Sequence, residues 1–490
     1  MKKYLFILAI STVILNSCGL ESGNFFSDYR EYSNEDVIDG DNYKGFEENP
    51  FIKTSDNPVS TFSIDADGAS YSNIRRYILS ENSIPPKAAV RTEELINYFT
   101  LDYPFNISDH PISLNGEVAS CPWNNEHKLI RIGIKGKNIP DNQLPPSNFV
   151  FLIDVSGSMS SSDKLELLKE GFKLFVDQMS SEDRISIVTY AGSAGVLLES
   201  TSGNEKSKIK AAINKLGAGG STAGAQGIIT AYEIAQKNFI INGNNRVILG
   251  TDGDFNVGTS NTEELVKLIE EKRELKIFLT VLGVGRGNLN DNMMEQIADN
   301  GNGNYEYLDN LEQLKKVFIY EFNKFYPVAK DVKVQVEFNP ELVQEYRLIG
   351  YENRVLKEED FENDTKDAGE IGSNQSITAL YEILPATTII NREKSTFTIK
   401  FRYKLPDTDT SIPINLDIYD EGNTFETSSN FMKFSASISS FSMILRDSQY
   451  KGTSNFENIK KWLKQVNLND EHGYIDEFET MVEKASKLKK

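Results

Sequence analysis

The sequence predicts an α/β domain with a mainly parallel sheet, inserted between β-rich flanking segments, with a helical N-terminal unit and a helical C-terminal tail. Between residues 147 and 326, continuous apolar runs alternate with amphipathic segments, the pattern of a parallel sheet covered by helices on both faces. Residues 111–136 and 331–440 alternate apolar and polar side chains with period two, which is typical of strands with one solvated face. Because the ends of an inserted domain lie close together, we expect these two strand sets to form one β-sandwich.

The composition is that of a globular protein and restricts the partners it can have. The chain has 490 residues, 39% of them apolar and 25% charged, and its 52 basic and 72 acidic residues give a net charge of −20. So acidic a surface repels phosphate backbones, and we expect no nucleic-acid partner. With two cysteines and three histidines, a zinc site of these ligands is nearly excluded. Any bound metal should be a hard cation that is held by oxygen atoms.

The first residues have the pattern of a secretory signal. MKKYLFILAISTVILNSC begins with two lysines, continues with an apolar core and ends at Cys18, and this core is short for a membrane-spanning helix. Leu15-Asn16-Ser17-Cys18 resembles the lipobox of bacterial lipoproteins. The resemblance implies that residues 1–17 are removed and that Cys18 is acylated. We therefore expect a membrane-anchored lipoprotein of the cell envelope, in the outer membrane and facing the periplasm or the surface. The alternative is an ordinary signal peptide with a cysteine near the cut.

Three segments precede the α/β domain. Residues 18–57 are polar and lack periodicity, so we expect a flexible tether. In residues 58–106 apolar side chains recur at helical spacing, as in SNIRRYI and EELINYF, which indicates a small helical unit. Residues 107–146 should contribute strands to the flanking sandwich, because HKLIRIGIKG alternates with period two.

Within residues 147–326 we expect strands and helices to alternate. The expected strands are FVFLIDV, RISIVTY with VLLES as its short neighbour, RVILGTD, KIFLTVLGV and GNYEYL. The expected helices are DKLELLKEGFKLFVDQM, KSKIKAAINKL, a segment from Thr222 to about Phe239, ELVKLIEEKREL after a capping-box pattern, MMEQIADN and LEQLKKVFIYEF. Residues 327–440 should be β-rich, as DVKVQVEFN and TFTIKFRY indicate, and residues 441–490 should form C-terminal helices.

Polar side chains follow the first strand of this domain. In an open α/β sheet, ligands bind beyond the carboxyl ends of the strands, and FVFLID would place Asp154 at that edge. Ser156 and Ser158, two positions apart in an extended turn, can aim their hydroxyls the same way. Gly157 would let the backbone bend between them without a Cβ clash.

Two more oxygen donors are expected at the same edge. GAGGST is a glycine-rich loop that opens a helix and offers Thr222, and the strand RVILGT leads directly into Asp252. Hydroxyl and carboxylate oxygens suit Mg²⁺, which takes six oxygen ligands and keeps some water. The glycine loop lacks the G-x-x-x-x-G-K-[ST] pattern of a phosphate-binding loop, so we expect no bound nucleotide.

These residues carry a resemblance to a known domain. DVSGSM, GGST and TDGDFN resemble the metal-ion-dependent adhesion site of von Willebrand factor type A (VWA) domains, and all five positions match. The resemblance implies a Rossmann-like fold. It also implies that Ser156, Ser158 and Thr222 contact the metal, with Asp154 and Asp252 reaching it directly or through water. Outside this domain, STFSIDADGASYSNIRRYI, VRTEELINYF, RLIGYENRVL and FSMILRDSQYKG are similar to the YfbK-like VWA lipoproteins of bacteria.

The resemblance implies a binding function. Hydroxyls and water leave the charge of the metal poorly neutralised, and an Asp or Glu of a protein ligand can complete the coordination. The ion would be Mg²⁺, with Mn²⁺ or Ca²⁺ as alternatives. An alternative hypothesis is that the protein is an envelope scaffold whose metal site only stabilises the fold.

A third hypothesis is a metal-dependent hydrolase, but we expect no enzyme activity. A hydrolase would need a general base near the metal, and no histidine occurs between residues 147 and 326. The DxD pattern in IDADG resembles the nucleophile motif of haloacid-dehalogenase-like phosphatases, but a local turn or helix cap explains Asp65 and Asp67 better. Cys121 is expected to be a buried, unreactive thiol.

Overall fold

The computed structural model describes most of the chain after residue 34. The described residues are 35–38, 40–65, 67–106, 108–220, 224–253, 262–366 and 368–489. They all belong to one compact unit, Asn34–Lys490. Within these ranges, no helix is both long and apolar enough to span a bilayer. The expected signal peptide and Cys18 lie outside the described residues.

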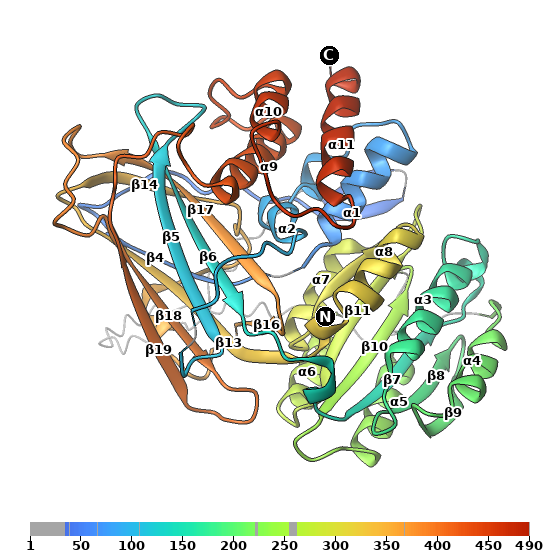
Figure 1. The fold of residues 1–490 in the computed structure, drawn as a ribbon. Helices are drawn as coiled ribbons and strands as arrows, with labels where there is room; N and C mark the ends of the chain where they lie inside the picture. Colours follow the sequence, from blue (N-terminus) through green and yellow to red (C-terminus); the bar gives the residue numbers. More distant parts are fainter. Residues whose placement is uncertain are drawn as a thin grey trace, which may run out of the picture. The chain divides into compact units, whose positions relative to one another are not determined.

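The α/β part is built on a six-stranded sheet with the strand order β12-β11-β10-β7-β8-β9. Its strands are β7 (Ser147–Asp154), β8 (Arg184–Tyr190), β9 (Ala194–Ser202), β10 (Asn244–Thr251), β11 (Phe278–Val284) and β12 (Tyr305–Leu308). Neighbouring strands run parallel, except that β9 pairs antiparallel with β8 at the edge. The sheet is therefore mainly parallel, as expected, and β7 is one of its two central strands (Figure 1).

Helices cover both faces of this sheet. The helices are α3 (Leu165–Gln178), α4 (Lys206–Asn214), α5 (Gly224–Lys237), α6 (Thr262–Arg273), α7 (Asp291–Asn300) and α8 (Leu311–Lys315), which continues into the π-helical η5 (Lys316–Tyr320). Alternate residues of β7 belong to different cores: Phe151 packs with α3, α4 and α8, whereas Leu152 packs with α5, α6 and α7. Burial on both faces explains why β7 is apolar almost throughout.

The flanking strands form two further sheets. One has the order β3-β14-β17-β6-β5, with β3 (Ile52–Lys53), β14 (Val343–Ile349), β17 (Ser376–Pro385), β6 (Lys128–Gly136) and β5 (Ile112–Ser120). The other has the order β15-β4-β13-β18-β19, with β16 on β13, and consists of β15 (Val355–Leu356), β4 (Val59–Ser63), β13 (Pro327–Phe338), β18 (Phe397–Lys404), β19 (Ser411–Ile418) and β16 (Gly369–Gly372).

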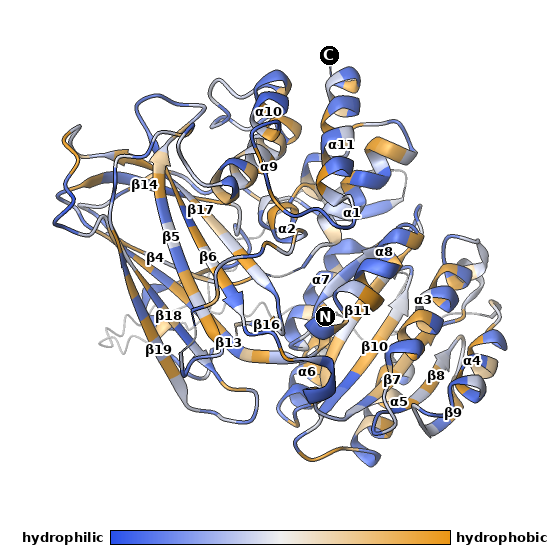
Figure 2. Ribbon diagram, viewed as in Figure 1, coloured by the Kyte–Doolittle hydropathy of each residue, from blue (hydrophilic) through white to orange (hydrophobic). Residues whose placement is uncertain are grey.

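These two sheets enclose one core and connect the segments on either side of the α/β part. β6 pairs antiparallel with β17, so that Lys128 lies opposite Ile383. Residues of both sheets, such as Ile132 and Val334, lie in one apolar cluster. Figure 2 shows the hydropathy alternation along β6, in contrast to the apolar runs of β10 and β11. The α/β part is thus inserted into a sandwich, as the alternation in the sequence predicted.

Helices from the two ends of the described chain form one layer. The N-terminal set is α1 (Ala69–Arg75), the π-helical η1 (Arg76–Ser80), η2 (Lys87–Ala89) and α2 (Thr92–Asn97), and the C-terminal set is α9 (Asn430–Arg446), α10 (Phe456–Leu463) and α11 (Tyr474–Leu488). Phe99 packs against Phe434 and Phe478 in a shared core, and Figure 1 places α9 and α11 beside α1 and α2.

The prediction of a flexible tether over residues 18–57 is wrong for its second half. β1 (Glu35–Ile38) and β2 (Asp41–Lys44) form a hairpin, and β3 pairs with β14. Asp41 and Tyr43 are 2% and 0% exposed. Strands of two to four residues that are held by single polar anchors carry no readable periodicity, which is why this stretch looks like a linker in the sequence.

Two predicted segment boundaries also differ from those in the structure. β4, at the start of the expected helical unit, pairs with β13 and belongs to the sandwich. α9 begins at Asn430, eleven residues before the expected start of the C-terminal helices at residue 441, and the Ser429 hydroxyl caps it by accepting from the Met432 N–H (3.1 Å). Its middle, SASISSFS, buries several serines, and these small polar residues conceal the helical pattern.

Candidate metal centre

Asp154 ends β7 and is fully buried. One carboxylate oxygen accepts from the Ser156 backbone N–H (2.8 Å). The other accepts from the Tyr190 hydroxyl (3.3 Å), at the end of β8, and from the Thr251 hydroxyl (3.2 Å), at the end of β10. Because both neighbouring strands contribute a donor, Asp154 is fixed at the carboxyl edge of the sheet.

The two serines of the motif lie together. The Oγ atoms of Ser156 and Ser158 are 3.0 Å apart in the short turn after β7 that forms the 3₁₀ helix η4 (Gly157–Ser160). The Ser158 hydroxyl lies near enough to Asp252 to help lower the pKa of that carboxyl. The serine pair therefore lies beside the carboxylate that follows β10.

The glycine-rich loop lies against this turn. The Gly157 N–H donates to the Gly220 carbonyl (3.1 Å), and the Gly219 N–H donates to the Val155 carbonyl (2.7 Å). Gly220 has a φ of +101°, whereas Gly157 stays out of the left-handed region, so the bend that we expected at Gly157 needs no glycine conformation. Thr222, two positions further on, lies outside the described residues. Gly219 and Gly220, which precede Thr222 in the chain, therefore lie against the serine turn.

Asp252 is held by two side chains that sequence reasoning missed. It is 0% exposed, and its Oδ2 accepts from Lys164 Nζ (2.9 Å) and from Asn288 Nδ2 (3.0 Å). Lys164 also donates to Asn288 Oδ1 (2.7 Å), which closes a three-membered ring of contacts. Lys164 is 6% exposed, and Asn288 lies in the loop 285–290 that follows β11. Sequence signals for the pair are weak, because a lysine before a helix and a polar loop residue are common.

The two aspartates differ in their electrostatics. Burial raises the pKa of Asp154, and the nearby charge of Asp252 adds to this effect. Burial also acts to raise the pKa of Asp252, but hydrogen bonds from Asn288 and Lys164 outweigh it and lower that pKa. Two buried carboxylates thus face one ammonium group and two hydroxyls. A hard divalent cation fits the carboxylate and hydroxyl oxygens of this set, since the one ammonium group balances only one of the two negative charges.

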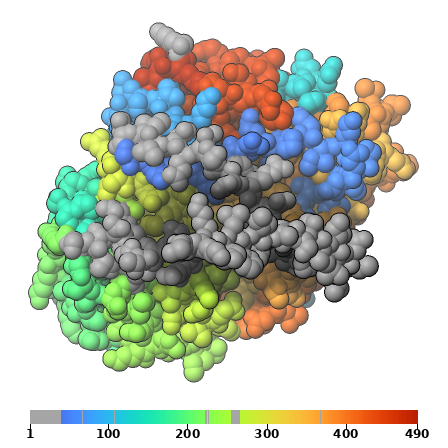
Figure 3. All heavy atoms as spheres, turned by 180° about the vertical axis from the view of Figure 1, so that it is seen from behind, coloured from blue at the N-terminus to red at the C-terminus, as the bar shows by residue number. Residues whose placement is uncertain are grey.

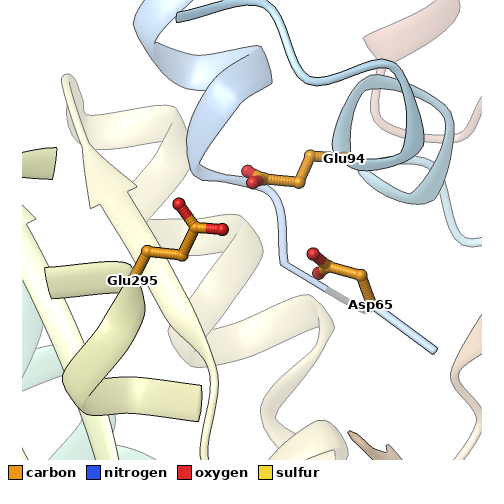
Figure 4. Close-up of side chains that lie close together, drawn as sticks. All are labelled: Asp65, Glu94 and Glu295. Atoms are coloured by element: carbon orange, nitrogen blue, oxygen red, sulfur yellow. The ribbon is translucent and has the colours of Figure 1, made fainter. Parts of the chain in front are cut away.

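A second carboxylate cluster lies between α2, α7 and the loop after β4. One oxygen from each of Asp65, Glu94 and Glu295 lies within 4.8 Å of the others, and Figure 4 shows their carboxylates turned toward one another. Arg91 pairs with Glu94 and with Glu295, and Arg354 pairs with Asp65 (2.9 Å). Burial raises the pKa of Glu94 and raises that of Glu295 to about 7. Arg91 and Arg354 therefore compensate the charge of this cluster, and burial favours the protonated form of Glu94 and Glu295.

The phosphatase-like motif belongs to this cluster. Asp65 is 3% exposed, and its Oδ1 accepts from the Asp67 N–H (2.9 Å), which is the local turn that the sequence predicted. Its other oxygen is occupied by Arg354. The contacts of Asp65 are those of a structural ion pair.

A cavity of about 270 Å³ lies between the segment after α2, η5 and the loop before α11. Lys316 and Lys324 line it, and both pair with Glu321. Asp470 and Glu471 line it as well, so the cavity carries carboxylates beyond the one that these lysines neutralise. It shares no residue with the metal centre.

Comparisons with known proteins agree with this architecture. The von Willebrand factor type A domain matches residues 148–319, a model described as von Willebrand factor matches residues 37–131, and the C-terminal region of the uncharacterized protein YfbK matches residues 323–488. Over 467 residues, the chain is 39% identical to the uncharacterized protein YfbK of Escherichia coli (strain K12), covering 90% of this chain and 80% of that protein. The chain belongs to the YfbK family of VWA-domain proteins.

More distant similarities cover parts of the chain. A UPF0353 protein of Mycolicibacterium vanbaalenii is 29% identical over 205 residues, which are 36% of this chain and 61% of that protein. The solved structure of a von Willebrand factor type A protein from Catenulispora acidiphila is 16% identical, covers 77% of this chain and 91% of its own, and has a TM-score of 0.44. We draw no functional argument from a likeness at this level.

Proposed function

We propose that this protein is a cell-envelope lipoprotein that binds a protein ligand through a Mg²⁺ ion at its VWA domain. The residues that would hold the ion are Asp154, Ser156, Ser158, Thr222 and Asp252. The observation that carries the proposal is the convergence of the four described members at the carboxyl edge of the sheet, where Ser156 and Ser158 lie 3.0 Å apart and Asp154 and Asp252 follow neighbouring strands.

The bound ion would supply a Lewis-acidic position for a carboxylate of the partner. The chain's own residues prepare that position. Asp154 is locked by Ser156, Tyr190 and Thr251, and Asp252 is locked by Lys164 and Asn288, so neither carboxylate has to be ordered when the ion binds. Preorganisation of this kind lowers the entropic cost of binding.

The anchoring part of the proposal rests on the lipobox-like sequence at Cys18. The chain would be held at the membrane by acyl chains on Cys18, each buried CH₂ contributing about 0.8 kcal/mol. The chain itself carries no enzyme activity in this proposal, which is supported by the lack of a histidine between residues 147 and 326.

Calorimetric titration with Mg²⁺ and Mn²⁺ tests the metal site. We expect wild type to bind one divalent ion and Asp154→Ala to lose binding by at least about 100-fold, because a metal ligand and its neighbours are disturbed together. Wild-type protein that binds neither ion would overturn the proposed function.

A second measurement separates the binder from the scaffold. Affinity capture from envelope extract is compared for wild type and Asp154→Ala, in Mg²⁺ and in EDTA, together with their melting temperatures. A binder loses capture of one defined partner with both EDTA and the substitution, and a carboxylate-to-amide change in that partner reproduces the loss. For a scaffold, the melting temperature instead falls when EDTA removes the metal, while capture of the partner does not depend on the metal.

A further inference from the structure

The loop 285–290, which follows β11, reaches the metal centre twice. Asn288 binds both Asp252 and Lys164 through its side chain. At the same time, Asn290 packs against the glycine after Asp252, since a Cβ on Gly253 would lie 2.3 Å from the Asn290 nitrogen. The position of this loop therefore determines the position of Asp252.

A segment far away in the sequence holds the backbone of this loop. Asp41 Oδ1 accepts from the Gly287 N–H (2.7 Å) and from the Leu289 N–H (3.2 Å), the residues on either side of Asn288. The Asn42 N–H in turn donates to the Leu289 carbonyl (2.8 Å). One carboxylate oxygen and one backbone donor thus fix three groups of the loop.

The backbone at Gly40 passes very close to the backbone of the loop at Gly287. Gly40 has a φ of +93°, and a Cβ at this position would lie 2.0 Å from the Gly287 carbonyl oxygen. Only glycine fits there, because any side chain would push the two backbones apart. We call residues 40–44 the N-terminal strap.

The strap is anchored on its other side as well. Asp41 Oδ2 pairs with Arg76 (2.7 Å), which is 6% exposed, and the Tyr43 hydroxyl donates to Asn73 (3.1 Å) within the core. Seen from behind, the blue residues at the start of the described chain lie on the same face as yellow elements of the α/β part (Figure 3). A buried carboxylate between an arginine and two backbone N–H groups is an expensive arrangement to break.

We propose that Asp41 is a positioning residue of the metal centre, and that the N-terminal strap sets its metal affinity by holding Asn288 against Asp252. This inference rests on the proposed metal site. It assigns to the strap, which follows the expected lipid anchor in the sequence, control over a site on the α/β domain. Displacement of the strap would loosen Asn288 and weaken metal binding without removing any metal ligand.

The test measures Mn²⁺ affinity by electron paramagnetic resonance for wild type, Asp41→Ala, Asn288→Ala and the double variant. Outer-sphere partners of metal sites contribute about 10- to 100-fold in affinity, so we expect this range for Asn288→Ala and about 5- to 20-fold for Asp41→Ala. Because Asp41 acts through Asn288, the double variant should bind no more weakly than Asn288→Ala alone. An additive double variant would overturn the proposed route.

Thr54→Ala is the matched control. Thr54 is 4% exposed and anchors the same N-terminal segment, but its hydroxyl donates to the Val343 carbonyl of the sandwich (2.6 Å). We expect its Mn²⁺ affinity to stay within about twofold of wild type, since no metal-site contact is disturbed. A loss equal to that of Asp41→Ala would mean that general destabilisation explains both, and the strap would be refuted.

Gly40→Ala serves if Asp41→Ala does not fold. It leaves every hydrogen-bonding side chain in place and should still weaken Mn²⁺ binding and speed amide exchange at Gly287 and Leu289. If wild type binds Mn²⁺ and these variants bind it equally well, the strap proposal fails while the metal site stands. If wild type binds no divalent ion, the proposed function fails first and removes the strap proposal with it.

Discussion

Lys164→Met tests the electrostatics of the metal centre most directly. Lys164 and Asp252 are 6% and 0% exposed, and their charged atoms are 2.9 Å apart. Removing one partner of a buried ion pair leaves an uncompensated charge and costs about 3–5 kcal/mol. For a domain of the size of residues 148–319, each kcal/mol lowers the melting temperature by about 2–4 °C, so we expect a loss of about 6–20 °C in EDTA.

The matched control is Lys169→Met on α3. Lys169 is 8% exposed, but its partner Glu166 has a side chain that is 61% exposed. A solvated carboxylate loses little when its partner is removed, and the hydrogen bond from Lys169 to the Leu216 carbonyl (3.2 Å) adds about 1 kcal/mol, so this variant should cost about 1–2 kcal/mol. The assay is thermal unfolding followed by circular dichroism, for both variants and wild type at matched concentration.

Mg²⁺ adds a second arm to the Lys164 experiment. Saturation with Mg²⁺ at about 100 times its Kd stabilises any binding-competent form by about 2.7 kcal/mol. Since the ion would also compensate the bare charge of Asp252, we expect a larger rise in melting temperature for Lys164→Met than for wild type. Equal melting of both proteins in EDTA would refute the buried ion pair, and an equal Mg²⁺ response would refute an ion next to Asp252.

Three further predictions concern the rest of the chain. Cys18→Ala should move the protein from the membrane to the soluble fraction, and an unchanged distribution on fractionation would argue against acylation. Burial raises the pKa of Glu93 to about 8 and that of Glu295 to about 7, above the ordinary value of 4.5, so the folded state holds protons that the unfolded chain releases. The contribution of these two groups to the free energy of unfolding should therefore be highest below about pH 4.5 and fall as pH rises to about 8. Denaturant titrations should show a shallower fall for Glu295→Gln than for wild type. Cys121 is 3% exposed and burial raises its pKa, so it should react with thiol reagents only after denaturation.

The features that local pattern encodes were predictable from the sequence. The parallel strands follow from continuous apolar runs, because both faces of β7 are buried. Asp154, Ser156, Ser158 and Asp252 follow from the ends of two such strands, since parallel neighbours bring their carboxyl ends to one edge. Position at the end of a strand is thus information that a sequence can carry.

The supporting contacts were not predictable in this way. Lys164 and Asn288 meet Asp252 from 88 and 36 positions away, and Asp41 meets Gly287 across 246 positions. None of these residues belongs to a periodic pattern, and each has a side chain that is ordinary in a loop. Sequence reasoning therefore found the expected metal ligands but not the residues that hold them in place.

The position of Asp41 bears on what a VWA domain of this family includes. The match to the VWA domain covers residues 148–319, yet the Gly287 and Leu289 N–H groups find their acceptor at Asp41, outside that range. In a VWA segment on its own, both groups would need another partner, since buried backbone donors are rarely left unpaired. The N-terminal strap therefore completes the hydrogen bonding of the loop that carries Asn288. It follows that the surroundings of Asp252 are built by two parts of the chain, because the loop that carries Asn288 is itself held by Asp41.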